Sequence, residues 1–257
     1  MKRSVYILFL LIPVLACNRQ PEVNSQEKLV QSVLWYQHSA EMHALYYQGY
    51  NLAGFVIEAL QPAGEGKPYA VVLDIDETVL DNSPQSAQQI FDGQPYSEEL
   101  WDEWSRLAEA APLPGALEFT RNAAEKGIAV FYITNRMAHT LGETIENLQK
   151  FGFPDADSTH VLPRPEGSSS SKNERRAAVA ASYDIVLFLG DNLGDFDGMF
   201  DDRSVNEGKD AVALAKDQFG RRFIIFPNPV YGYWERAALS LPGGEKATPE
   251  SVLKGFR

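Results

Sequence analysis

The sequence of 257 residues contains a single cysteine, Cys17, so no disulfide bond can form within one chain. Basic residues are also scarce: 23 lysines and arginines face 35 aspartates and glutamates, which gives a formal net charge of −12. A nucleic-acid-binding surface needs clustered lysine and arginine, so this charge argues against a nucleic-acid partner. The sequence has no internal repeats and no long low-complexity tract. What remains is a globular composition suited to an envelope or secreted protein that handles small ligands.

The first 17 residues have the organisation of a targeting signal. Lys2 and Arg3 form a basic start, and residues 5–15 form an apolar core that is too short to span a bilayer as a mature helix. A lone cysteine directly after such a core, here Cys17, resembles a bacterial lipobox, in which the thiol is acylated and becomes the first mature residue. An ordinary secretory signal with an incidental cysteine is the alternative.

We therefore expect residues 1–16 to be a lipoprotein signal peptide and residues 17–25 to be a polar tether. Lipidation of Cys17 would anchor the protein to a membrane that it does not span. Asn18, rather than an aspartate, follows the cysteine, which in bacteria with two membranes favours the outer membrane. The expected location is the bacterial cell envelope, at the outer membrane.

The rest of the sequence alternates between short apolar runs and amphipathic segments, as in α/β proteins with a parallel sheet. Strands are predicted at residues 71–73, 128–133, 185–189 and 222–226, with a further short strand at 159–162. Helices are predicted between them at residues 116–126, 139–151, 173–182 and 209–219. The predicted fold is α/β, with a Rossmann-like parallel sheet covered by helices on both faces.

Two segments predict a small, mostly helical subdomain beside this sheet. Residues 26–60 lack proline and carry apolar residues at helical spacing, which predicts one long helix or two joined near Gly49 or Gly54. Residues 83 to about 111 lie between the first strand and the next helix, where an insertion would overhang a site at the sheet edge. Both segments would belong to a single domain that covers residues 26–257.

The prediction of function depends mainly on the sequence AVVLDIDETVLDN, residues 70–82. Asp74 and Asp76 follow a buried strand, at the carboxyl edge where α/β proteins carry their chemistry. Two carboxylates so close repel each other unless a cation lies between them or one holds a proton. Both options suit phosphoryl transfer, in which one carboxylate attacks phosphorus and the other passes a proton to the leaving oxygen. A solvated acidic turn is the alternative for the aspartate pair alone.

Polar residues also follow the later strands. Thr134 and Asn135 stand where the second strand turns into a helix, a place that can bind an anion or simply cap the helix. Lys172 opens a helix, where its charge opposes the helix dipole unless an anion lies between them. Asp191 and Asp195 follow the third strand in the sequence GDNLGDF. These groups would meet at one edge of the sheet.

This order of aspartate pair, threonine, lysine and final acidic motif resembles the haloacid dehalogenase superfamily of phosphohydrolases. DIDET, GDNLGDF, PNPVYGYWE and the lipobox more narrowly resemble the class C acid phosphatases, the lipoprotein e group. The resemblance covers nearly the whole mature chain. It implies a Mg²⁺-dependent phosphomonoesterase that hydrolyses nucleoside 5′-monophosphates and aryl phosphates through an aspartyl-phosphate, with most activity at mildly acidic pH.

The resemblance also implies a role for each matching aspartate. Asp74 would be the nucleophile and a metal ligand. Asp76 would be the acid and base, and its backbone carbonyl would contact the same Mg²⁺. Asp191 would bind the Mg²⁺ through its side chain, and Asp195 would orient water at the metal.

Five other residues would bind the substrate in such an enzyme. Thr134, Asn135 and Lys172 would hold the phosphate oxygens, where charge spreads in the transition state. Trp101 and Tyr231 would sandwich an aromatic leaving group, an interaction that tolerates different bases.

Two other functions remain open at this stage. The first is a surface lipoprotein that binds nucleotides without cleaving them. The second is a phosphotransferase that passes the phosphoryl group to an alcohol. The expected partners are small phosphomonoesters and a membrane, with a homodimer as a possible assembly.

Overall fold

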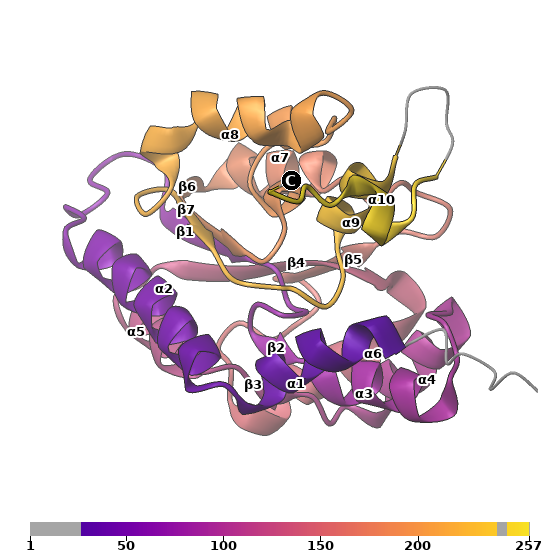
Figure 1. Ribbon diagram of the computed structural model, residues 1–257. Coiled ribbons are helices and arrows are strands. Elements are labelled where there is room, and N and C mark those ends of the chain that lie inside the picture. The colour runs from indigo at the N-terminus through magenta and orange to yellow at the C-terminus, as the bar shows by residue number, and fades with distance from the viewer. Residues whose placement is uncertain (1–26, 241–245, 257) are drawn as a thin grey trace, which may run out of the picture.

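The computed structural model describes residues 27–240 and 246–256, so the predicted signal peptide, Cys17 and the tether lie outside the described residues. A parallel sheet forms the centre, with the strand order β5–β4–β1–β6–β7 (Figure 1). Its strands are β1 (Tyr69–Leu73), β4 (Ala129–Met137), β5 (Val161–Arg164), β6 (Asp184–Gly190) and β7 (Phe223–Ile225). The predicted α/β fold with a parallel sheet is confirmed.

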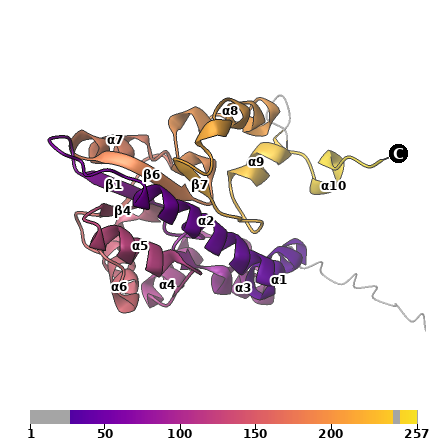
Figure 2. The same cartoon turned by 90° about the vertical axis from the view of Figure 1, so that its left-hand side faces the viewer.

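Helices cover both faces of this sheet (Figures 1 and 2). One face carries α2 (Ala40–Glu58), α5 (Ala116–Glu125) and α6 (Leu141–Phe151). The other face carries α7 (Asn173–Ser182) and α8 (Lys209–Leu214).

Side chains of β1 alternate between these two layers. Val71 and Leu73 are fully buried in the core beneath α2 and α5, whereas Ala70 and Val72 pack in the core beneath α7. Because both faces of the strand are buried, its sequence is a continuous apolar run rather than an alternating one. The end of that run places Asp74 at the carboxyl edge of the sheet.

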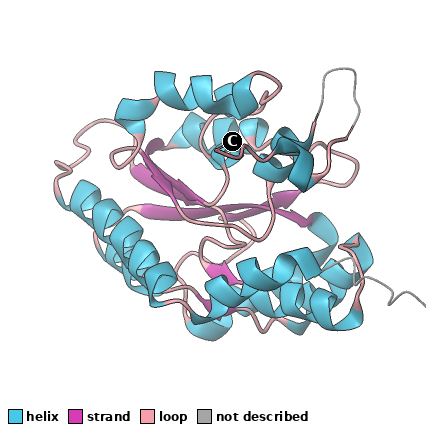
Figure 3. Cartoon of the chain, in the orientation of Figure 1, coloured by secondary structure: helices cyan, strands magenta, loops and turns pink. Residues whose placement is uncertain are grey.

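A second group of helices lies beside α6, below the sheet in the view of Figure 1. It contains α1 (Val30–His38), α3 (Ser83–Asp92) and α4 (Glu98–Leu107), the last two from the predicted insertion (Figure 3). Two short strands, β2 (Leu80–Asp81) and β3 (Ala111–Pro112), pair antiparallel where this insertion leaves and rejoins the chain.

The remaining elements are short. Helices α9 (Tyr233–Leu239) and α10 (Pro249–Val252) follow β7. Single 3-10 turns occur at Glu27–Leu29, Ala138–Thr140, Leu193–Asp195, Gly198–Phe200, Asn206–Gly208 and Lys216–Gln218. The last of these turns follows α8, so the predicted helix at 209–219 is interrupted. Within the described residues, no helix combines the length and apolar character needed to cross a membrane.

The N-terminal helical segment is interrupted at Ser39, and the predicted junction near Gly49 or Gly54 is wrong. Ser39 is extended, and its hydroxyl accepts a hydrogen bond from the Met42 N–H at 3.1 Å, as a helix N-cap does. Gly49 instead lies inside α2, where an added Cβ would come within 2.5 Å of the Phe226 ring. Glycine at this position allows α2 to pack closely on the chain that follows β7.

Candidate active site

The chain leaves β1 in a compact loop that contains both aspartates of DIDET. The N–H of Asp74 donates to the carbonyl of Leu189 in β6 at 2.9 Å, which continues the sheet pairing to the first aspartate. Just beyond it, the Ile75 carbonyl accepts hydrogen bonds from the N–H groups of Val79 and Leu80, both at 2.9 Å. These bonds turn the chain back on itself and hold the aspartates at the sheet edge.

Two tyrosines of α2 attach this loop to the core. The Tyr46 hydroxyl donates to the carbonyl of Glu77 at 2.5 Å, and the Tyr50 hydroxyl donates to that of Thr78 at 2.7 Å. Glu77 has a left-handed backbone with φ of 55°, and its buried carboxyl accepts from the Asn82 N–H at 2.8 Å. Burial raises the pKa of Glu77 well above its usual range, so this carboxyl is a structural hydrogen-bonding group rather than a free charge.

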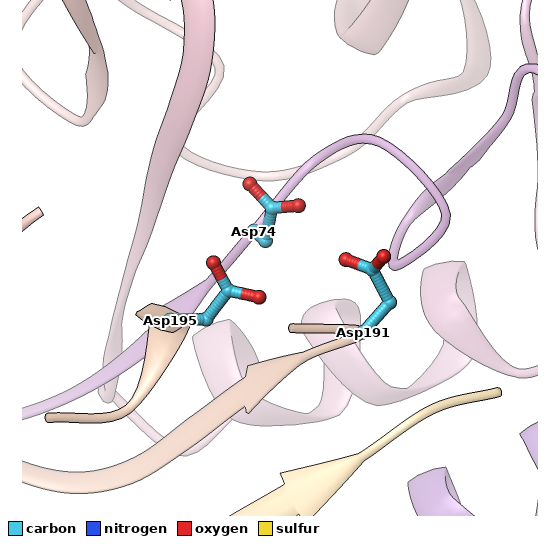
Figure 4. A group of neighbouring side chains, drawn as sticks. All are labelled: Asp74, Asp191 and Asp195. Atoms are coloured by element: carbon cyan, nitrogen blue, oxygen red, sulfur yellow. The ribbon is translucent and has the colours of Figure 1, made fainter. Parts of the chain in front are cut away.

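Three carboxylates converge at the end of β1 and β6 (Figure 4). One oxygen from each of Asp74, Asp191 and Asp195 lies within 4.8 Å of the others. Asp195 is held there because its carboxylate accepts from the Asn192 N–H at 2.9 Å. Gly190, the last residue of β6, makes room for it: an added Cβ would come within 2.3 Å of the Asp195 carboxylate.

Burial and mutual repulsion make these carboxylates costly to ionise without a cation. Burial, together with the charges of Asp195 and Asp76, raises the pKa of Asp74 to about 7 despite the opposing effect of Lys172. Burial also raises the pKa of Asp191 well above its usual value, and the charges of Asp195 and Asp74 add to this effect. Binding of a cation that replaces the protons on these carboxyl groups would therefore stabilise the cluster.

Lys172 supplies one positive charge to this cluster. It precedes α7 and is only 3% exposed, and its ammonium contacts the carboxylate of Asp74 and lies 2.7 Å from that of Asp195. Burial alone would lower the pKa of Lys172, but the charges of Asp195 and Asp74 outweigh it and raise the pKa. In this structure the anions beside the ammonium are the two carboxylates, and the predicted role of Lys172 in holding phosphate stays a prediction.

The side chain of Asp76 points to a different set of partners. Its Oδ1 accepts from Nε and Nη2 of Arg136 at 2.9 and 2.8 Å, and from Nδ2 of Asn82 at 3.0 Å. Its Oδ2 accepts one long hydrogen bond from the described residues, at 3.4 Å from the hydroxyl of Thr134. Asn82 is itself held by Trp104, whose indole N–H donates to its side-chain oxygen at 2.8 Å. The orientation of Asp76 is thus set by a buried guanidinium and an amide.

A cavity of about 850 Å³ opens above these aspartates, and Trp101 and Tyr231 line it. Their ring centres lie 6.5 Å apart with 74° between the planes, an edge-to-face contact. A flat ligand between parallel rings needs about 7 Å, or two carbon contact distances. The structure brings the two rings into contact, but one ring must turn before they can sandwich a ligand, so the predicted stacking role stays a prediction.

His139 attaches helix α4, which carries Trp101, to the loop before α7. Its Nδ1 lies 2.7 Å from the carboxylate of Glu166, and its Nε2 lies 2.5 Å from that of Asp102. Hydrogen bonds to Glu166 and Asp102 raise the pKa of His139, so the doubly bonded, charged imidazole is favoured at mildly acidic pH. This contact positions one wall of the cavity.

Several site residues had no role assigned from the sequence. Arg136 is the third residue of TNR, and its burial was the missing signal, since a buried guanidinium needs a carboxylate. Asn228 lies in PNPVYGYWE and donates to Asp191 at 2.8 Å. Arg175 donates to the Thr134 carbonyl and, at 2.8 Å, to the side chain of Asn135, so the end of β4 is held from α7.

The chemistry of the donor set fits a hard divalent cation. Carboxylate oxygens are the ligands that Mg²⁺ and Ca²⁺ prefer, and three of them, from Asp74, Asp191 and Asp195, face one point. Lys172 balances only part of their charge. A divalent cation at this point would remove both the repulsion and the cost of ionisation.

Metal binding is expected to stabilise the protein more at neutral than at acidic pH. In the metal-free protein the raised pKa of Asp74 favours its protonated form, a contribution that is lost as the pH rises through about 7. A divalent cation that binds the cluster must displace such protons, so its stabilising effect grows in the same pH window. We expect saturating Mg²⁺ to raise Tm by about 5–10 °C at about pH 7.5 and by much less at about pH 5. Differential scanning fluorimetry measures this. Equal shifts at both pH values would contradict it, and Asp191→Asn should abolish the shift.

The chain belongs to the acid phosphatase family of the HAD superfamily, subfamily IIIB, whose family model matches residues 15–234. Two solved structures extend the comparison, both of the class C acid phosphatase from Bacillus anthracis. One is 44% identical, with a TM-score of 0.79, and covers 84% of this chain and 90% of that chain. The other structure has tungstate bound and is 42% identical, with a TM-score of 0.83. It covers 91% of this chain and 100% of that chain. The resemblance to class C acid phosphatases is confirmed.

More distant relatives share only part of their length with this chain. The "Acid phosphatase 1" of Solanum lycopersicum is 28% identical over 131 residues, which is 49% of this chain and 51% of that protein. The "Class B acid phosphatase" of Marinomonas sp. (strain MWYL1) is 30% identical over 145 residues, 53% of this chain and 60% of that protein. The chain thus spans about half the length of the curated relatives it matches.

Proposed function

We propose that the protein is a Mg²⁺-dependent phosphomonoesterase that hydrolyses nucleoside 5′-monophosphates and aryl phosphates through an aspartyl-phosphate on Asp74. The observation that carries this proposal is the convergence of Asp74, Asp191 and Asp195 on one point, with Lys172 in contact with two of them. The class C acid phosphatase with tungstate bound supports it, because tungstate is a tetrahedral oxyanion like phosphate.

The first step is attack of an Asp74 carboxylate oxygen on phosphorus, with cleavage of the ester P–O bond. The leaving oxygen takes a proton from Asp76. Oδ2 of Asp76 is suited to carry that proton, because Oδ1 already accepts from Arg136 and Asn82. Lys172, beside Asp74, is placed to balance charge on the non-bridging oxygens as it spreads in the transition state.

The second step hydrolyses the aspartyl-phosphate. Asp76, now deprotonated, takes a proton from water as the water oxygen bonds to phosphorus and the bond to Asp74 breaks. Phosphate leaves and both aspartates return to their starting forms. Asp74, Asp191 and the backbone carbonyl of Asp76 would hold the metal ion, which when bound neutralises negative charge on the phosphoryl oxygens.

The proposal is tested by phosphate release from a panel of nucleoside, aryl and alkyl monophosphates, with Mg²⁺ and after chelation. We expect nucleotides and aryl phosphates to release phosphate in the presence of Mg²⁺ and not after chelation. Release should be fastest at mildly acidic pH. Ligand binding without release in Mg²⁺ would instead identify a binding protein. Formation of a phosphorylated alcohol when an acceptor is added would identify a phosphotransferase.

Trp101→Ala is expected to reduce kcat/KM for a nucleoside 5′-monophosphate by about 10–100-fold, since stacking on one aromatic ring contributes about 1–3 kcal/mol. A small alkyl phosphate has no ring to stack, so its kcat/KM should change little. Steady-state kinetics on the two substrates measures the difference. Phe55→Ala, which removes a 66% exposed ring from α2, is the matched control. Equal losses on both substrates would exclude the stacking role.

We also propose that the protein is lipid-anchored through Cys17 at the outer membrane. The lipobox resemblance and the polar sequence after Cys17 support this. Labelling with radioactive palmitate in cells, lost in Cys17→Ser, would test it. A homodimer is a further proposal, which sedimentation velocity would test.

A further inference from the structure

The cations that line the active-site cavity fall into two groups. Among the described residues there are six of them: Lys28, Arg136, Arg164, Lys172, Arg203 and Arg236. Four form ion pairs, namely Lys28 with Glu235, Arg136 with Asp76, Arg164 with Glu98, and Lys172 with Asp74 and Asp195. Arg203 and Arg236 form no ion pair with any carboxylate in residues 27–240 and 246–256.

These two arginines lie around one aromatic ring. The guanidinium carbon of Arg203 is 5.5 Å from the ring centre of Tyr233, and that of Arg236 is 5.0 Å from it. The ring is held in place because the Tyr233 hydroxyl is hydrogen-bonded to the hydroxyl of Ser170. Arg203 is held by its own contact, a 2.6 Å hydrogen bond to the side chain of Asn192. The pair therefore forms one built patch on the cavity wall, which we call the Tyr233 patch.

Several arginines of the described residues form no ion pair, but Arg203 and Arg236 are the two of these that line the active-site cavity. Burial lowers the pKa of Arg203, and the nearby aspartates only partly offset that effect. A half-buried cation in this state gains from an anion that arrives with a ligand, and the fork of an arginine matches a phosphate with two hydrogen bonds.

We propose that Arg203 and Arg236, arranged around Tyr233, bind a second phosphate group on the leaving alcohol of the substrate. The substrate class is a phosphomonoester whose alcohol carries another phosphate, such as a nucleoside bisphosphate. This inference rests on the proposed function, because it assumes that the reacting phosphate lies at Asp74 and Lys172. The second phosphate then occupies the same cavity, at the Tyr233 patch.

The test measures binding rather than turnover, so that it stays independent of catalysis. Isothermal titration calorimetry with the Asp74→Asn protein in Mg²⁺ compares adenosine 5′-monophosphate with adenosine 3′,5′-bisphosphate and adenosine 2′,5′-bisphosphate. We expect at least one bisphosphate to bind about tenfold more tightly than the monophosphate. When Arg236→Gln is added to the Asp74→Asn protein, the Kd of the bisphosphate should rise by about ten times the factor by which the Kd of the monophosphate rises. Arg236 is chosen because Arg203 contacts Asn192, next to Asp191.

Arg222→Gln is the matched control. It removes the same charge from an exposed arginine that also lies over a ring, 5.6 Å from the centre of Phe188, but outside this cavity. It should affect both ligands little. Equal affinity for all three nucleotides would overturn the inference, as would equal losses on the mono- and bisphosphates in Arg236→Gln. Absence of phosphate release by the unmodified protein would reject the proposed function alone, because the binding difference would remain.

Discussion

Asp74→Asn is expected to lower kcat for phosphate release by at least about 10⁴-fold, because an amide cannot attack phosphorus or form the phosphoenzyme. Folding should be retained, since the new side chain has the same shape. The asparagine also avoids the cost of ionising a carboxyl whose pKa is raised to about 7. Thermal unfolding should show a Tm close to that of the unmodified protein.

Acid-quenched reactions give the direct measurement. Mass spectrometry of the unmodified protein should show one phosphoryl group on the peptide that contains Asp74, and Asp74→Asn should show none. Asp217→Asn is the matched control, because this aspartate is exposed in the turn after α8 and its side chain makes no hydrogen bond in the described part of the chain. A phosphoenzyme trapped on another residue, or turnover retained by Asp74→Asn, would reject covalent catalysis at this position.

The second large effect is expected at Arg136, which acts through Asp76. Arg136→Ala leaves Asp76 and Asn82 without their shared guanidinium, whose side chain is 1% exposed. Loss of one partner from a buried pair costs about 3–5 kcal/mol, so the free energy of unfolding should fall by about that amount. The loss of acid catalysis should lower kcat/KM for glycerol 1-phosphate by about 10²–10³-fold.

A comparison of substrates with different leaving groups distinguishes a positioning role of Arg136 from a general loss of structure. Nitrophenolate leaves with little help from an acid, so 4-nitrophenyl phosphate should lose only about tenfold in kcat/KM. Arg136→Lys keeps the charge but not the planar fork, and it should show the same selective loss with less destabilisation. Arg121→Ala, which removes an exposed arginine that donates to two carbonyls, is the control. Equal losses on the two substrates would show that Arg136 is needed only for folding.

The position of the aspartate cluster was predictable from sequence because parallel strands end at one edge. Asp74 follows β1 and Asp191 follows β6, and these strands are neighbours in the sheet. Lys172 was predictable from its unfavourable place at the start of a helix. Each of these residues is located by the backbone, so local sequence patterns were sufficient.

Features that depend on side-chain contacts were not predictable in the same way. The pairing of Arg136 with Asp76 joins a residue of β4 to one in the loop after β1, and no local pattern encodes it. The edge-to-face contact of Trp101 with Tyr231 depends on how α4 is held by His139 and its carboxylate partners. The break at Ser39 was missed because the N-cap at Ser39 ends the first helix, whereas the two glycines are tolerated inside α2, Gly49 because the Phe226 ring packs directly against it.

The order of strands in the sheet also constrains when the aspartate cluster could bind a metal ion. β1 is made first, but its neighbour β6, which supplies Asp191 and leads to Asp195, is synthesised more than a hundred residues later. A chain emerging from the ribosome therefore offers a cation only isolated carboxylates. Capture of a metal ion at this cluster must therefore follow folding of almost the whole domain, so a shortage of metal would leave folded protein with an empty cluster.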